Sequence, residues 1–200
     1  MNDPFITRAS DWDRPDKIYM SKKFADELIS RINPLPEWKA LEIGAGTGLV
    51  GLLIEPLVRA IVMEDVSESM LEVLKQKLNG NSKVEIVHGE VTDYKLQDID
   101  LIFSNMAFHH IPDIEKTLQH LASITKPGAW IAIGDLVTED GSFHHFEPIP
   151  HKGFDTSALS VQFVQAGFEV KSVETHNVIS KIVEDITTEY EQFILIARRV

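Results

Sequence analysis

The stretch LEIGAGTGLVG at residues 41–51 decides the fold prediction. A short apolar run at 39–43 leads into Gly44, Gly46 and Gly48, and a second apolar run follows, which predicts a strand, a tight turn and a helix start. Glycine is needed where the backbone takes a positive φ or where a ligand approaches the main chain closely. Free amide groups at the following helix N-terminus favour a negatively charged group. The turn therefore predicts a ligand site.

Two classes of nucleoside cofactor compete for this turn. The dinucleotide fingerprint is GxGxxG, whereas this run is GxGxG and is preceded by Glu42, which would repel a pyrophosphate. A ligand with an ammonium or sulfonium group tolerates such a carboxylate. Asp65 follows 21 positions after Gly44, at the end of the apolar strand predicted at 61–63, where an acidic residue accepts ribose hydroxyls. The alternative for Asp65 is a simple helix N-terminal charge.

These residues resemble those of a known family. The glycine turn with Glu42 is similar to the first motif of the class I S-adenosylmethionine-dependent methyltransferases, and DVSESML at 65–71 is similar to the motif that follows it. The resemblance implies S-adenosyl-L-methionine as the cofactor. It places the ribose on Asp65 and the adenosine near Val66 and Met70. The methionine part of the cofactor lies beside the residues of the first motif, which are Glu42, Gly44, Ala45, Gly46 and Gly48.

Three later segments also resemble motifs of the family. VEIVHGEVTDY at 84–94 is similar to the turn beneath the adenine, although Glu90 replaces the usual Asp and Val91 the usual small residue. DIDLIFSNMAFHHIPD at 98–113 resembles the strand that closes the cofactor pocket, with Asn105 and Met106 beside the methionine end. KPGAWIAIGDL at 126–136 is similar to a structural turn and fifth strand of the family.

The resemblance implies an α/β fold: a Rossmann-like, doubly wound, seven-stranded sheet with helices on both faces and the last strand antiparallel. We expect residues 1–200 to form a single methyltransferase domain. Its expected parts are an N-terminal helical lid or cover at 1–36, a cofactor-binding core at 37–136, a substrate loop at 137–154, and a C-terminal helix and strands at 155–200. The segment NVISKIVEDITTE at 177–189 is compatible with a helix or with a long loop.

Composition excludes several other classes of protein. The 31 acidic and 19 basic residues give a net charge of −12, which disfavours nucleic-acid partners. The chain has no cysteine, which excludes disulfides, thiolate zinc sites and cysteine nucleophiles. No apolar run of membrane-spanning length occurs, and the first residues lack the pattern of a signal peptide, so we expect a cytoplasmic protein without a membrane partner. The oligomeric state stays open.

The methyl acceptor is less well defined by the sequence. Methyl transfer to a hydroxyl benefits from a base, and His109 and His110 are the candidates, with helix capping or packing as the alternative. Trp12 and Tyr19 are candidates for a lid, with core packing as the alternative for Tyr19. In the loop, the candidates for the substrate pocket are His144, His145 and His151.

The same loop region is rich in metal-ligating side chains: Asp135, Asp140, His144, His145, Glu147 and His151. Their spacing matches no fixed metal motif, so we predict a polar loop over the substrate and no metal. The favoured function is methyl transfer from S-adenosyl-L-methionine, by in-line displacement, to a small-molecule acceptor. The alternatives are a nicotinamide-dependent oxidoreductase and a cofactor-binding module without catalysis.

Overall fold

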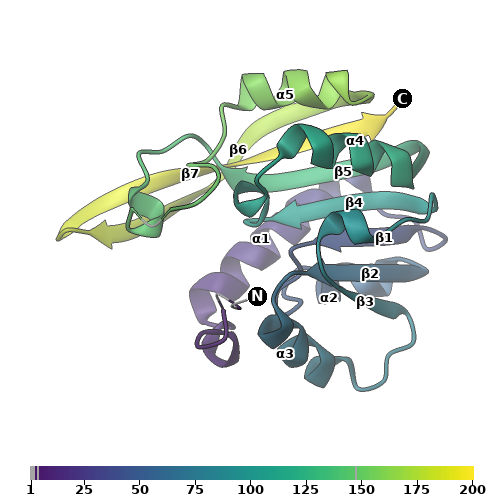
Figure 1. Cartoon of the computed structure of the whole chain (residues 1–200), viewed down its shortest axis with the longest axis horizontal. Helices are drawn as coiled ribbons and strands as arrows, with labels where there is room; N and C mark the ends of the chain where they lie inside the picture. Colours follow the sequence, from purple (N-terminus) through teal and green to yellow (C-terminus); the bar gives the residue numbers. More distant parts are fainter. Residues whose placement is uncertain (1–2, 4, 147) are drawn as a thin grey trace.

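A single seven-stranded sheet organises the computed structural model, which describes residues 3, 5–146 and 148–200. The strands lie in the order β3-β2-β1-β4-β5-β7-β6 (Figure 1). Neighbours from β3 to β5 are parallel, and β7 is antiparallel to both β5 and β6. This confirms the predicted fold class. The bounds are β1 Lys39–Ile43, β2 Ala60–Asp65, β3 Val84–His88, β4 Ile99–Asn105, β5 Thr125–Leu136, β6 Phe168–Val183 and β7 Ile186–Arg199.

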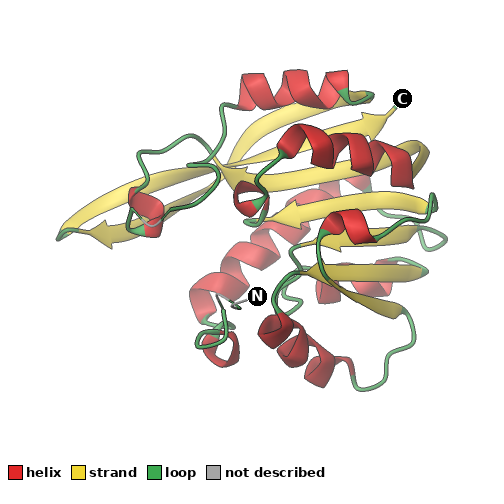
Figure 2. Cartoon of the chain, in the orientation of Figure 1, coloured by secondary structure: helices red, strands yellow, loops and turns green. Residues whose placement is uncertain are grey.

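Helices cover both faces of the sheet (Figure 2). One apolar cluster joins the sheet to α1 (Pro15–Ile32), α2 (Gly51–Ile54) and α3 (Glu68–Leu78). The other joins it to α4 (Ile114–Ile124) and α5 (Thr156–Gln165). Among the described residues, no helix combines the length and apolar character needed to cross a membrane.

The helix boundaries follow from local capping. The side chains of Ser67, Asp113 and Asp155 accept hydrogen bonds from backbone N–H groups in the first turns of α3, α4 and α5. Helix α1 ends at Asn33, which takes the left-handed conformation with φ 52°. These caps fix where each helix begins or ends relative to the edge of the sheet that carries the ligand motifs.

The segment 177–189 is neither helix nor loop, and this corrects the sequence interpretation. It forms the far part of a long hairpin in which β6 and β7 pair throughout, with a two-residue turn at Glu184 and Asp185. Both turn residues have positive φ, 49° and 66°, as a tight hairpin turn requires. The hairpin extends beyond the rest of the sheet (Figure 1).

The loop at 137–154 packs against this hairpin. Its ends are joined by a bridge between Val137 and Phe154. In the middle of the loop, the short helix η5 (Ser142–His144) contacts the hairpin, because Lys181 Nζ donates to the Phe143 carbonyl at 2.7 Å. The hydroxyls of Ser142 and Tyr190 lie 2.6 Å apart. The hairpin thereby supports the loop that carries His144.

Candidate active site

A cavity of about 580 Å³ opens where β1, β2 and β4 end at the same edge of the sheet. Ligand sites of open α/β sheets lie at this edge. The volume is within the range of about 300–1,000 Å³ that is common for small-molecule sites. Most of the residues predicted from the sequence line it: Trp12, Glu42, Gly44, Ala45, Gly46, Asp65, Val66, Met70, Glu90, Val91, Asn105, Met106, His109, His110 and His144.

Four predicted site residues are not among those that line the cavity. Gly48 instead faces α3, since a Cβ there would lie 2.5 Å from Leu74. Tyr19 is 65% exposed, and His145 is also exposed. His151 uses Nε2 to contact the Ile111 carbonyl at 3.0 Å, so it holds the loop in place. Of the candidate metal ligands, Glu147 lies outside the described residues.

The glycine turn is shaped by a close approach between two strand ends. Gly44 has φ +68°, and a Cβ at this position would lie 2.3 Å from the Cβ of Ala107. Gly46 has φ +54° and open space around it. Its amide N–H donates to Asp65 Oδ2 at 2.7 Å. The turn and the carboxylate therefore hold one another in place before any ligand binds.

Three carboxylates concentrate negative charge beneath this turn. Glu42, Glu64 and Asp65 are 3%, 3% and 8% exposed. Burial raises the pKa of Glu42 and of Glu64 well above the usual range, and the neighbouring Asp65 carboxylate adds to the rise. Oε2 of Glu42 is buried and has no hydrogen-bond partner in the described part of the chain. Such a site stabilises a cation and disfavours a phosphate.

Replacing Glu42 with glutamine is expected to change how stability depends on pH. Because the folded-state pKa of Glu42 is raised, the unfolded chain releases this proton first, and stability falls as pH rises above 4.5. Glu42→Gln removes that loss. We expect the free energy of unfolding of the variant, relative to wild type, to increase as the pH of urea titrations is raised above 4.5. A difference that does not change with pH would show that Glu42 is not the buried acid described here.

Two further predicted site residues, Asn105 and Met106, lie at the end of β4. Oδ1 of Asn105 is buried and is not hydrogen-bonded within residues 3, 5–146 and 148–200. Met106 has φ +57°, which is uncommon for a side chain without local polar groups. Its N–H donates to the Gly134 carbonyl at 2.8 Å, so β5 holds this conformation. Strained backbone of this kind is concentrated at functional sites.

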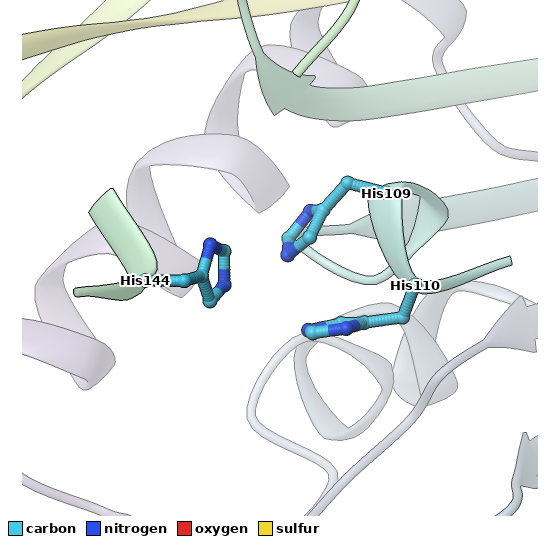
Figure 3. Close-up of side chains that lie close together, drawn as sticks. All are labelled: His109, His110 and His144. Atoms are coloured by element: carbon cyan, nitrogen blue, oxygen red, sulfur yellow. The ribbon is translucent and has the colours of Figure 1, made fainter. Parts of the chain in front are cut away.

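Three histidines that line the cavity face one another (Figure 3). His109 and His110 come from the short helix η4 (Phe108–His110) after β4, and His144 from η5 in the loop. The ring of His109 lies 4.2 Å from that of His110 and 4.9 Å from that of His144, measured between centroids. The cluster therefore combines two segments that are far apart in the sequence.

Asp135, at the end of β5, fixes the orientation of His109. Its Oδ1 lies 2.6 Å from Nδ1 of His109, and its Oδ2 accepts the backbone N–H of the same residue at 3.1 Å. Both side chains are almost fully buried. Partial burial, and then the proximity of His109, lower the pKa of His144 to about 4. The same causes lower the pKa of His110, although its side chain is more exposed. These two rings are consequently neutral near pH 7.

An N-terminal segment contributes to the cavity wall, and of its residues only Trp12 was predicted from the sequence. Phe5 and Trp12 contact edge to face at 5.5 Å between ring centroids, and Phe5 also meets His110 at 6.5 Å. Asp3 accepts the backbone N–H of Ser69 at 2.9 Å. No sequence motif predicts a role for Asp3 or Phe5, because the contacts with Ser69 and His110 join residues more than 60 positions apart.

The part of the chain that forms this site resembles known proteins. Residues 41–133 match a family model described as a methyltransferase domain. This part of the chain is therefore similar to the methyltransferases that its sequence motifs resemble. The match runs from β1 to β5 across the glycine turn and the strand ends that line the cavity.

Two relatives from this family illustrate its range. A demethylmenaquinone methyltransferase from Clavibacter sepedonicus is 29% identical over 62% of this chain and 49% of its own length. A malonyl-[acyl-carrier protein] O-methyltransferase from Methylococcus capsulatus is 30% identical over 56% of this chain and 43% of its own length. The chain thus spans no more than about half the length of these relatives.

A solved structure shares the fold along nearly the whole chain. The S-adenosylmethionine-dependent methyltransferase from Aquifex aeolicus has a TM-score of 0.72 and 22% identity, covering 98% of both chains. At this identity the similarity concerns the fold, and it extends through the antiparallel hairpin at the end of the sheet.

Proposed function

We propose that this chain transfers a methyl group from S-adenosyl-L-methionine to a small-molecule acceptor. One observation carries the proposal: a single cavity is lined both by the glycine turn with its buried carboxylates and by a histidine cluster. The turn suits a nucleoside with a cationic group, and the cluster suits a nucleophile that must lose a proton. We also propose that residues 1–200 act as one domain with the parts expected from the sequence.

The proposed cofactor site uses the residues predicted from the sequence that line the cavity. Asp65 is assigned to the ribose hydroxyls, and Asn105 and Met106 to the methionine end. Oε2 of Glu42 has no hydrogen-bond partner among the described residues, and a cationic group bound above it would favour ionisation of this carboxyl group. The remaining assignments are Gly44, Ala45 and Gly46 beside the methionine part, Val66 and Met70 beside the adenosine, and Glu90 and Val91 beside the adenine.

The buried carboxylates favour this cofactor over a nicotinamide dinucleotide. A pyrophosphate placed at the glycine turn would lie close to Glu42, Glu64 and Asp65, and like charges in a buried site repel strongly. When bound, S-adenosyl-L-methionine instead supplies a positively charged sulfonium whose methyl group is electrophilic. Both the charge of the site and the GxGxG spacing of the turn therefore favour S-adenosyl-L-methionine.

The residues of the chain have three tasks in this proposal. The turn and Asp65 position the donor, and Phe5 and Trp12 cover the cavity and exclude water. The histidines face the acceptor. The Asp135 carboxylate accepts from Nδ1–H of His109, so Nε2 carries the lone pair that takes a proton from an acceptor hydroxyl. His110 lies beside it and is the second candidate base.

The acceptor class is left open by the relatives, since their names refer to demethylmenaquinone and to malonyl-[acyl-carrier protein]. A hydroxyl-bearing small molecule fits the histidine-lined part of the cavity best. Nucleic acid fits poorly, because the net charge is −12.

Binding and turnover separate this proposal from its alternatives. We expect calorimetry to show one site for S-adenosylhomocysteine and no heat of binding with NADH. We also expect S-adenosylhomocysteine to form when S-adenosyl-L-methionine is incubated with a panel of phenols, other hydroxyl compounds, carboxylates and amines. Tight NADH binding would support an oxidoreductase. Binding of S-adenosylhomocysteine without turnover across the panel would support a non-catalytic module.

A further inference from the structure

We propose that His109, His110 and His144 bind a divalent transition metal, with Zn²⁺ as the best match, and leave one coordination position open toward the cavity. One ligand atom from each residue lies within 4.8 Å of the others. Among the described residues, no other such group of three potential ligands comes as close together. The binding part of this inference is independent of the proposed function, whereas its chemistry rests on that function.

The hydrogen bonds of Asp135 prepare His109 as a ligand. The backbone N–H groups of His109 and Leu136 both donate to this carboxylate, at 3.1 and 2.7 Å. A carboxylate that accepts these bonds also accepts Nδ1–H of His109, which leaves the lone pair on Nε2. A histidine that ligates a metal almost always donates its other ring N–H to a carboxylate, a carbonyl or water.

Two ring nitrogens in the cluster lack partners. His109 is 1% exposed, and its Nε2 has no hydrogen-bond partner in residues 3, 5–146 and 148–200. Nδ1 of His144 is also buried and has no hydrogen-bond partner among the described residues. An unpartnered buried acceptor is costly, by about 1–3 kcal/mol. Figure 3 shows the His109 and His144 rings facing a common space with His110 beside them.

The spacing is compatible with an open form of the site. In a tetrahedral zinc site with Zn–N bonds of about 2.0–2.1 Å, the ligand nitrogens lie about 3.3 Å apart. Since the ligand atoms lie within 4.8 Å of one another, they must approach by no more than about 1.5 Å. His109 is fixed by Asp135, so the His110 and His144 side chains must supply this movement. Binding would thus draw the His144 ring toward η4.

Three imidazoles form a recognised type of catalytic zinc site, in which the fourth position holds water or substrate. Here that position would face the space proposed for the acceptor. An acceptor hydroxyl bound there would ionise more readily, releasing its proton to solvent. The oxygen would keep the electron pair for the bond to carbon, while the sulfur keeps the pair of the broken S–CH₃ bond. With metal bound, this route replaces proton acceptance by Nε2 of His109.

The test is titration of the tag-free, chelator-treated chain with Zn²⁺ by calorimetry, and with Co²⁺ by visible absorption, without S-adenosyl-L-methionine. We expect one metal per chain and an absorption spectrum of nitrogen-ligated Co²⁺. His144→Asn should weaken Zn²⁺ binding at least about 100-fold, more than the about 10- to 100-fold expected for Asp135→Asn, which alters only an outer hydrogen bond.

His145→Asn is the matched control, because it removes the neighbouring imidazole of the same loop and keeps a residue that tolerates the positive φ of 53°. Its affinity for Zn²⁺ should equal that of wild type. Absence of Zn²⁺ binding by the folded wild type would overturn the proposal. Equal losses in the two loop variants, or unchanged binding in His144→Asn, would overturn it too. Because no donor is present, failure of the metal site and failure of the proposed function are distinguishable.

Discussion

Asp65→Ala is expected to weaken binding of S-adenosylhomocysteine by about 100-fold or more. Hydrogen bonds to a charged group contribute about 1.5–3 kcal/mol each, and two ribose hydroxyls would lose such a partner. The substitution also frees the backbone N–H groups of Gly46 and Ser67, which now donate to Asp65 at 2.7 and 2.8 Å. Calorimetric titration of the purified variant measures the change.

Asp26→Ala is the matched control for this prediction. Asp26 is an exposed carboxylate on α1 whose ion-pair partner is Lys22, and exposed pairs contribute little to stability. Its variant should bind as wild type does. Asp65→Asn, which keeps one side-chain oxygen, should give an intermediate affinity. A thermal melt of each variant checks that it is folded. Wild-type affinity in folded Asp65→Ala would refute the assignment of this residue to the ribose.

Gly44→Ala is expected to destabilise the chain by about 2–4 kcal/mol, through backbone strain and overpacking. The added Cβ would lie 2.3 Å from the Cβ of Ala107, and φ at this position is +68°. To relieve this clash, the end of β4 would have to move away from β1, and this movement would also distort the cavity. Urea denaturation measures the loss of stability.

Gly46→Ala tests the same turn without the collision. Gly46 also has a positive φ, +54°, but no atom lies within 4 Å of an added Cβ in the described structure. We expect a loss of only about 1 kcal/mol, from the left-handed conformation alone. Gly46 lines the cavity, so its variant should bind S-adenosylhomocysteine less well while remaining stable. Equal destabilisation by the two substitutions would mean that the close approach at Gly44 is not what shapes the turn.

The residues predicted for the cofactor come together at one edge of the sheet because each one lies next to a strand end. Gly44, Asp65 and Asn105 follow apolar runs that become β1, β2 and β4. Parallel strands bring such ends to one edge, so local patterns were sufficient to group them. Gly48 belongs to the same motif but does not line the cavity, because the three-dimensional turn directs it toward Leu74.

The histidine cluster and the hairpin could not be predicted, because they depend on contacts between residues that are far apart in the sequence. His144 and His145 are adjacent and chemically equal, and only the turn of η5 decides that the first enters the cavity while the second is exposed. The spacing of the loop ligands gave no metal motif because the cluster draws on two segments. Likewise, the hairpin turn at Glu184 and Asp185 lacks the glycine or asparagine that usually marks such a turn.

The most direct test of the proposed site is a crystal structure of the chain with S-adenosylhomocysteine. We predict that its ribose hydroxyls lie within hydrogen-bond distance of Asp65 and that its sulfur lies between Asn105 and the histidine cluster. A ligand bound elsewhere at saturating concentration, or one whose ribose lies away from Asp65, would contradict the placement of the donor proposed here.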